Sequence, residues 1–347
     1  MKHHQTFSRP MVLALAWSAI LACAGCGPSG PAEHLFSGPT MGTEYHVKVI
    51  ADLGPEAREK LDGLVADTLA GVNGLMSTYD PKSELSRFNQ WASTDPFALS
   101  DETAEVFRIA LEVSRQSGGA FDVTVGPLVN AFGFGPDESP QPPDDGTLAS
   151  LRERVGYTML TLDGTRISKA RPDIYCDLSA VAKGYGVDVV ANMLEAQGYG
   201  RYMVEVGGEV RAKGMNLRGQ PWQIAVEKPI EDGRALQRIV SVEDQGLATS
   251  GDYRNFYTKD GQRYAHTIDP TTGRPVEHGI ASASVLHKSC AWADAYATAL
   301  MVLGAEKGID LAREQGLAVL LISHTPEGGF AEVSTPAFDA VSVVPSQ

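Results

Sequence analysis

Cysteine and basic residues are scarce in this 347-residue chain, and long apolar runs are missing. Only four cysteines are present, and two of them, Cys23 and Cys26, lie close to the N-terminus. The other two are too few for a disulfide framework, so we expect Cys176 and Cys290 to be buried free thiols, with a disulfide between them as the alternative. After the N-terminal segment, no apolar run is long enough to span a bilayer as a helix.

Positive charge is the second shortage, because 29 lysines and arginines face 43 acidic residues and leave a net charge of −14. An acidic surface argues against nucleic-acid binding, which needs basic residues against the phosphate backbone. The sequence also has neither a Walker-type loop nor a G-x-G-x-x-G loop. An anionic ligand would therefore need a local cation or free backbone amides.

The N-terminus has the pattern of a lipoprotein signal. Lys2 and Arg9 make a basic start, residues 11–22 form an uncharged apolar run, and small residues with Cys23 and Cys26 follow. We expect a signal peptide over 1–22, extending to 25 if Cys26 is the lipidated residue, and a lipid-anchored tether over 23–35. The chain would then be exported and held on the periplasmic side of a membrane, with the inner membrane favoured. An ordinary secretory signal is the alternative.

The rest of the chain mixes helical and strand patterns. Apolar spacing predicts helices over 56–79, from a cap at Ser100, over 182–197 and over 289–303, where Gly304 ends the last one. Strands are predicted over 44–50, 202–206, 222–227, 239–242 and 317–323, and a surface loop over 136–145. Strands grouped in antiparallel fashion between helices indicate an α+β fold, which we expect to occupy residues 36–340.

Two stretches suggest a charged site. Asp177 and Lys183 flank a predicted helix start, where free amides and a lysine would attract a phosphate; a surface cap with a solvated lysine is the alternative. Asp294 and Thr298 lie one helical turn apart among small apolar residues, and their oxygens suit Mg²⁺. The alternative there is an aspartate bonded to nearby backbone.

Two further stretches have turn chemistry. His266 ends a strand before an Asp-Pro-Thr-Thr-Gly turn, and it is either functional or structural. Gly118 and Gly119 precede Phe121 and Asp122, where the backbone could approach a ligand closely or simply turn from helix to strand.

Together these stretches resemble the ApbE-type FAD:protein FMN transferases, also described as thiamine-biosynthesis lipoproteins. The resemblance covers nearly all of the chain after the tether. The matching motifs, in order, are PTMGT at 39–43, MSTYDP at 76–81, SELSRFN at 83–89, FDVT at 121–124, FGFG at 132–135, DLSAVAKG at 177–184, VGGE at 206–209, TSGDY at 249–253, the turn after His266 and ADAYAT at 293–298.

The resemblance implies an α+β fold of two interlocked halves with the active site between them. It implies an enzyme that splits FAD, its substrate, and transfers FMN to a threonine or serine hydroxyl of a partner protein, releasing AMP. The expected partners are membrane or periplasmic redox subunits that carry a flavinylation motif. A hydrolase that transfers FMN to water and a non-enzymatic flavin-binding lipoprotein are the rival interpretations. The acceptor motif Asp-Gly-x-Thr-Gly-Ala-Thr is not seen in this chain, which favours the donor enzyme.

The resemblance also assigns residues. Mg²⁺ would be held by the carbonyl of Ala180, the carboxylate of Asp294 and the hydroxyl of Thr298. Catalysis would rest on Asp294 and on His266, which would help to remove the hydroxyl proton. The residues implied to contact FAD are Met41, Tyr79, Ala120, Phe121, Asp122, Asp177, Lys183 and His266.

Overall fold

An antiparallel sheet of eight strands organises the computed structural model, which describes residues 30–136, 141–230, 233, 235–253 and 255–345. The strand order is β1-β2-β6-β7-β10-β15-β16-β17, and every neighbouring pair is antiparallel. The bounds are β1 Ala32–Thr40, β2 Thr43–Ala51, β6 Tyr202–Val206, β7 Glu209–Lys213, β10 Gln245–Gly251, β15 Ile280–His287, β16 Ala318–His324 and β17 Phe330–Ser334.

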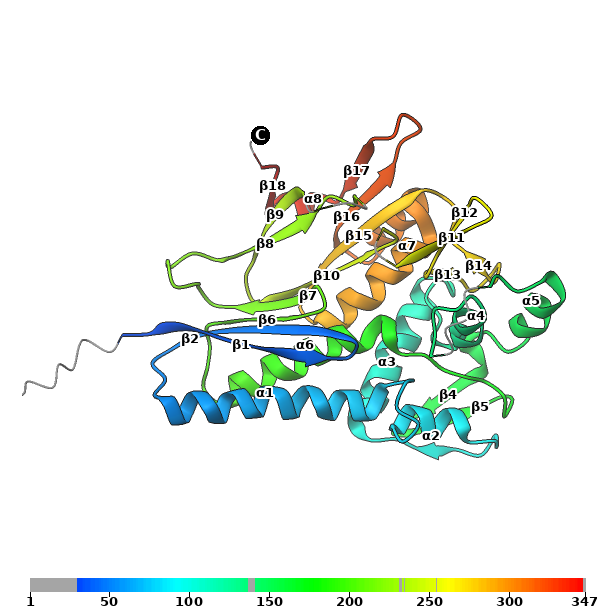
Figure 1. The fold of residues 1–347 in the computed structure, drawn as a ribbon, viewed down its shortest axis with the longest axis horizontal. Coiled ribbons are helices and arrows are strands. Elements are labelled where there is room, and N and C mark those ends of the chain that lie inside the picture. Colours follow the sequence, from blue (N-terminus) through cyan, green and yellow to red (C-terminus); the bar gives the residue numbers. More distant parts are fainter. Residues whose placement is uncertain (1–29, 137–140, 231–232, 234, 254, 346–347) are drawn as a thin grey trace, which may run out of the picture. The chain divides into compact units, whose positions relative to one another are not determined.

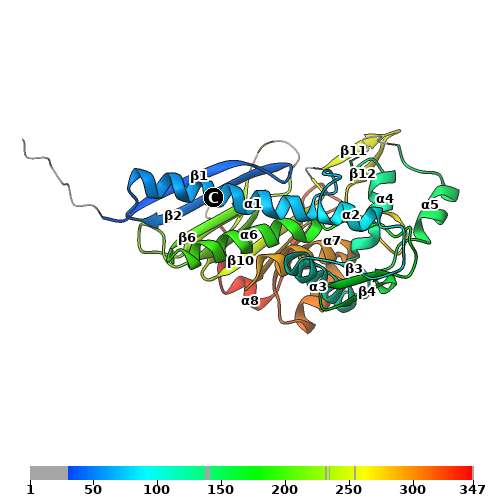
Figure 2. The ribbon, with the colours of Figure 1, turned by 90° about the horizontal axis from the view of Figure 1, so that it is seen from below.

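Three long helices pack together and against this sheet: α1 (Pro55–Met76), α6 (Ser179–Ala196) and α7 (Cys290–Glu314). In Figure 1, α1 and α6 run beneath β1, β2 and β6, and Figure 2 shows the same helices from below. The buried stripe of α1 recurs every three or four residues, at Leu61, Val65, Leu69, Val72 and Met76. This spacing places the stripe on one face of a helix, so its burial holds α1 in place.

Shorter elements surround the long helices. The helices are α2 Glu84–Gln90, α3 Asp101–Gln116, η1 Val123–Val125, α4 Gly126–Ala131, α5 Asp145–Arg152, η2 Tyr157–Met159 and α8 Pro336–Asp339. The small sheets are β3 Phe97–Ala98 with β5 Arg166–Lys169 and β4 Leu160–Asp163; β18 Ser342–Val343 with β9 Leu236–Val242 and β8 Trp222–Glu227; β11 Phe256–Lys259 with β12 Gln262–Ala265; and β13 Ile268–Asp269 with β14 Arg274–Pro275.

The predicted fold class is confirmed, because the molecule is a mixed α+β protein with antiparallel strands. The residues from Pro31 onward form one compact unit. An arrangement of two interlocked halves stays a prediction. The predicted signal peptide, including Cys23 and Cys26, lies outside the described residues, and within the described part no helix is long and apolar enough to cross a membrane.

Several predicted boundaries are corrected. β1 begins at Ala32, so residues 32–35 of the expected tether belong to the sheet, and β18 carries the domain past residue 340. α6 begins at Ser179, three residues before the expected start, and α1 ends at Met76 rather than at residue 79. Residues 137–140 of the expected 136–145 loop lie outside the described part.

The end of the last long helix is partly as predicted. Gly304 has φ 77° and ψ 177°, so it interrupts the helix as expected, but the chain resumes helical structure to Glu314. The positive φ favours glycine, and a side chain there would also meet the His278 ring at about 3.2 Å. The kink therefore separates two helical segments that the sequence pattern had not distinguished.

Both cysteines of the described part are buried and free, as the favoured interpretation had it. Cys176 packs in the large core around α3 and α7, whereas Cys290 packs in the core between α1, α6 and β6. Burial raises the pKa of each thiol, so both remain protonated at neutral pH.

Candidate active site

Two buried carboxylates and a partly exposed lysine form a charged centre between α6, α7 and β7: Glu209, Asp294 and Lys183. The Lys183 Nζ atom lies 3.3 Å from Glu209 Oε1 and 3.8 Å from Asp294 Oδ2. Asp294 is 2 % exposed and Glu209 is 3 % exposed. Two carboxylates buried this completely need the lysine, because an isolated charge in the protein interior is strongly disfavoured.

The electrostatics of the charged centre follow from this arrangement. Burial raises the pKa of Glu209 to about 8, although Lys183 opposes the shift and Asp294 adds to it. Burial also raises the pKa of Asp294, again against the attraction of Lys183. Burial alone would lower the pKa of Lys183, but Asp294 and Glu209 outweigh it and raise that pKa. Lys183 is therefore a permanent cation in an otherwise acidic protein.

Asp294 also meets the first turns of α6. The Gly184 amide donates to Asp294 Oδ2 at 3.0 Å. In a regular helix that amide points toward the carbonyl of Ala180, four residues earlier. The Ala180 carbonyl and the Asp294 carboxylate therefore lie on the same side of α6. Gly184 permits this approach, since a Cβ there would come within 2.4 Å of the Cys290 carbonyl oxygen.

The predicted magnesium ligands fit a hard cation. Thr298 lies one turn beyond Asp294 on α7, and its hydroxyl is 3.2 Å from Ser250 Oγ on β10. Together with the Ala180 carbonyl these are all oxygen donors, which Mg²⁺ prefers, and few enough that water and phosphate would complete its shell. Within the described residues, no group of three or more His, Cys, Asp or Glu side chains could hold a metal, so a site of several carboxylates is not formed there.

His266 lies between β12 and β13 and is half-buried. Its Nδ1 atom is 3.1 Å from the Asn255 carbonyl. A carbonyl oxygen only accepts, so Nδ1 carries the proton and Nε2 keeps its lone pair. Burial lowers the pKa of His266, and although the Asn255 carbonyl opposes this, the Lys183 charge lowers it further. The imidazole is therefore neutral at pH 7 and lies within the field of the charged centre.

Two other predicted carboxylates have a different character, and we call Asp122 and Asp177 the capping carboxylates. Asp122 Oδ1 accepts from the Thr124 amide at 2.8 Å and the Thr124 hydroxyl at 2.6 Å, and Oδ2 accepts from the Tyr157 amide at 2.7 Å. Asp177 Oδ1 accepts from the amide of Ser179 at 2.8 Å and from its hydroxyl. The Asp177 amide donates to Val123 O at 2.7 Å, which ties the two segments together.

The other predicted FAD contacts are spread around these groups. Met41, in the β1–β2 turn with φ 48°, has its sulfur 3.5 Å from the position of a Cβ at Gly186 on α6. Ala120 and Phe121 are buried, and the Phe121 ring belongs to the large core, so that residue would offer a ligand its backbone. The turn at 118–122 leads into η1 and α4 rather than into a strand, which corrects that alternative. Tyr79 is 67 % exposed in the segment after α1.

Glu209 was not among the residues predicted for the site. The only signal for it was the VGGE motif, where a glutamate follows a glycine pair at the start of a strand. Only the hairpin between β6 and β7 reveals that this glutamate turns inward to Lys183.

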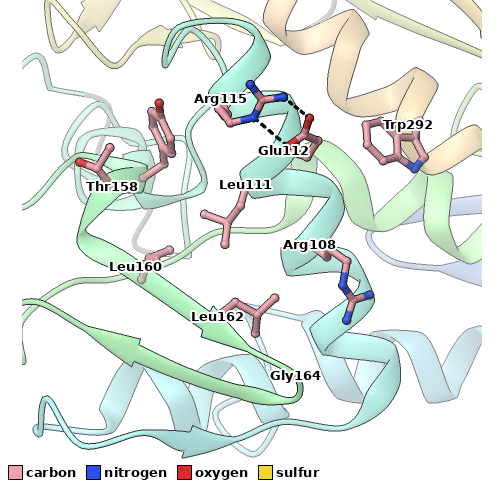
Figure 3. Close-up of a pocket in the computed structure, with 10 residues that line it drawn as sticks. Arg108, Leu111, Glu112, Arg115, Thr158, Leu160, Leu162, Gly164 and Trp292 are labelled. Carbon is pink, nitrogen blue, oxygen red and sulfur yellow. Dashed lines mark hydrogen bonds and ion pairs between the residues drawn. The ribbon is translucent and has the colours of Figure 1, made fainter.

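A separate cavity of about 660 Å³ lies between α3, the η2–β4 segment and the start of α7 (Figure 3). Leu111, Leu160 and Trp292 are among the residues that line it, and Arg115 at its edge pairs with Glu112 through a 2.9 Å hydrogen bond. Its lining contains none of the predicted site residues. One link between the cavity and these residues is the hydrogen bond that the Tyr157 amide donates to Asp122.

The fold and the charged centre define a class of protein. It is an α+β protein in which a lysine, Lys183, lies between the starts of two helices and an antiparallel sheet. The comparisons with known proteins are specific. Residues 41–321 match the model of the ApbE family, so this chain belongs to the ApbE family.

Individual relatives agree with that assignment. A protein of Vibrio cholerae named FAD:protein FMN transferase is 48% identical over 93% of this chain and 97% of its own length. The Haemophilus influenzae protein of the same name is 44% identical over 93% and 95% of the two chains. The solved structure titled "Flavin Transferase ApbE from Vibrio cholerae" superposes with a TM-score of 0.84 at 46% identity and covers 90% of this chain and 99% of that one.

Proposed function

We propose that this protein is an FAD:protein FMN transferase that uses Mg²⁺ and transfers FMN from FAD to a threonine or serine hydroxyl of a partner protein. The observation that carries the proposal is the charged centre. It supplies the partly exposed ammonium of Lys183 near the start of α6, in a chain that is 48% identical to a protein named for this activity. A pyrophosphate is the part of FAD that such a cation recognises.

The reaction exchanges one phosphorus–oxygen bond for another. The acceptor hydroxyl oxygen bonds to the FMN phosphorus, the bond from that phosphorus to the bridging oxygen breaks, and the AMP phosphate departs with the electron pair. The hydroxyl proton goes to a base. Nε2 of His266 suits this role, because the neutral imidazole has its lone pair on that atom.

The remaining residues bind and orient. Lys183 contributes positive charge against the pyrophosphate, and the charge is worth more in this buried site than in water. Ala180, Asp294 and Thr298 would hold Mg²⁺. When bound, the ion supplies Lewis-acid stabilisation of the charge on the pyrophosphate oxygens.

The test is an incubation of the protein with FAD and Mg²⁺, with and without an acceptor domain. A transferase releases AMP and leaves FMN covalently attached to the acceptor, at a yield equal to the AMP released. AMP with free FMN in both reactions would identify the hydrolase instead. Flavin that stays intact and bound would indicate the non-enzymatic flavin-binding protein.

We also propose that the chain is exported and lipid-anchored through Cys23 or Cys26, on the periplasmic side of the inner membrane. Its acceptors would then be membrane or periplasmic redox subunits. The N-terminal segment supports this proposal, because a basic start, an apolar run and small residues lead up to these cysteines. Metabolic labelling with a fatty acid tests it: the wild type should be labelled and the variant with both cysteines changed to Ala should not. Single substitutions identify the lipidated cysteine.

A further inference from the structure

Glu209 is a buried carboxylate for which the proposed chemistry has no role. It is the first residue of β7 and pairs with Val206 across the hairpin turn made by Gly207 and Gly208. Both glycines have positive φ, 57° and 103°, a conformation that other residues rarely adopt. The turn therefore fixes where the strand starts and sends the glutamate side chain inward.

The two oxygens of Glu209 are unequal. Oε1 lies 3.3 Å from Lys183 Nζ, whereas Oε2 is buried and has no hydrogen-bond partner among the described residues. Burying a carboxylate oxygen that has no hydrogen-bond donor lowers the stability of the folded protein. The presence of Glu209 at this position is therefore not explained by stability. We ask instead what the Glu209 carboxylate does to Lys183, the cation that it pairs with.

Lys183 pairs with two carboxylates, which differ in their distance from the ammonium and in their other hydrogen bonds. Asp294 lies farther away, at 3.8 Å, and already accepts the Gly184 amide. Asp294 is also the carboxylate that a cation would use. Once that charge is shared with a cation, Glu209 is the remaining counter-charge of Lys183 in the charged centre. The hairpin turn also lies beside the lysine stem, since a Cβ built at Gly207 would be 3.4 Å from Lys183 Cδ.

We infer that Glu209 is a positioning residue: it holds the Lys183 ammonium away from Asp294, so that the lysine faces the substrate phosphates and Asp294 stays available to the cation. This inference rests on the proposed function for the identity of the ligand. Without Glu209, attraction between Lys183 and Asp294 is unopposed and grows as the two approach. The ammonium would then compete with the cation for the same carboxylate.

The test measures FAD binding directly, by quenching of flavin fluorescence, with Mg²⁺ and with EDTA. The comparison is made at pH 8.5, above the pKa of about 8 of Glu209, so that the wild-type carboxylate is charged. Glu209→Gln removes that charge and keeps the shape. We expect FAD to bind about tenfold more weakly, and the Mg²⁺ concentration needed for half-maximal FAD binding to rise by a similar factor. Glu209→Asp should recover part of the loss.

Glu44→Gln is the matched control, because Glu44 is exposed and its carbonyl accepts the Gly207 amide of the same turn. The FAD affinity of this variant should equal that of the wild type.

A double substitution separates positioning from a structural role. In a Lys183→Met background, Glu209→Gln should change FAD affinity by less than about twofold, because the lysine through which it acts is gone. An equal loss in both backgrounds, or wild-type affinity and Mg²⁺ dependence in Glu209→Gln alone, would overturn the inference. Thermal unfolding confirms that each variant is folded. If the wild type binds FAD but releases no AMP, the proposed function fails while the binding comparison still decides the role of Glu209.

Discussion

The charged centre and the capping carboxylates both contain carboxylate groups, but they differ in how fully the fold supplies hydrogen-bond donors to them. Asp122 accepts three hydrogen bonds from its own surroundings, and Asp177 caps the start of α6 through Ser179. In the charged centre, by contrast, one Glu209 oxygen has no partner among the described residues, and Asp294 shares a lysine. Carboxylates that the fold satisfies stabilise the turn they are in, whereas carboxylates left short of donors are available to a ligand.

Asp294 gives the largest test of this difference. Asp294→Ala should lower FMN transfer at least about a thousandfold, because the carboxylate holds the proposed cation at the pyrophosphate. The fold should survive, since the Gly184 amide can return to its helical partner at Ala180. Initial rates of AMP release at saturating FAD measure the effect. Asp294→Asn is the matched control for charge: it keeps an acceptor for Gly184, and full activity in that variant without added metal would refute the metal assignment.

His266 comes next. His266→Gln should lower the transfer rate roughly a hundredfold and leave FAD affinity within a fewfold of the wild type, because a base acts on the reaction rather than on binding. The pKa of His266 is lowered, so the wild-type rate should rise with pH through a value below 6.5 and then level off. The variant should lack that rise, as seen in a pH–rate profile. His34→Gln, in β1, should keep both rate and profile.

Asp122 tests the capping carboxylates, whose oxygens accept hydrogen bonds from the surrounding fold. Asp122→Ala leaves the Thr124 and Tyr157 amides without their acceptor and should lower the free energy of unfolding by about 2 kcal/mol. Urea denaturation measures this change. Asp122→Asn retains an acceptor oxygen and should cost less. Transfer activity of the folded Ala variant should fall less than in Asp294→Ala; a larger fall would move Asp122 from the capping carboxylates to the catalytic machinery.

Glu209 gives the smallest effect, and it depends on pH. Its pKa is raised from 4.5 to about 8, so the folded protein retains a proton that the unfolded chain releases. This contribution to stability is complete below pH 4.5 and is lost as pH rises toward 8. Glu209→Gln mimics the protonated form. It should match the wild type below pH 4.5 and have the higher free energy of unfolding at pH 8.5, measured by urea denaturation without FAD or metal.

The opposite trend would be equally informative. If Glu209→Gln is less stable than the wild type at pH 8.5, the ion pair with Lys183 outweighs the burial of the carboxylate. Glu209 would then stabilise the fold, as the capping carboxylates do, and the difference between the charged centre and the capping carboxylates would be smaller.

Local pattern was enough for the long elements. The apolar spacing of α1 and the Ser100 cap of α3 predicted those helices, and strands β6 and β8 have the predicted bounds. Boundaries failed where the signal is not local. Ala32 belongs to β1 because it pairs with Ala51, which no nearby residue reveals. The start of α6 at Ser179 did have a local signal, since Asp177 Oδ1 accepts the Ser179 amide, but the apolar stripe that predicted the helix begins later.

The sequence by itself determined the chemistry available to this protein: a lysine and a carboxylate at a helix start, an aspartate and a threonine one turn apart, and a histidine beside a turn. It also determined the family, through motifs in a fixed order. Only the tertiary structure decided which of these groups meet. Lys183, Glu209 and Asp294 are separated by long stretches of chain, and their charges interact because α6, α7 and the β6–β7 hairpin pack together and exclude the water that would screen them.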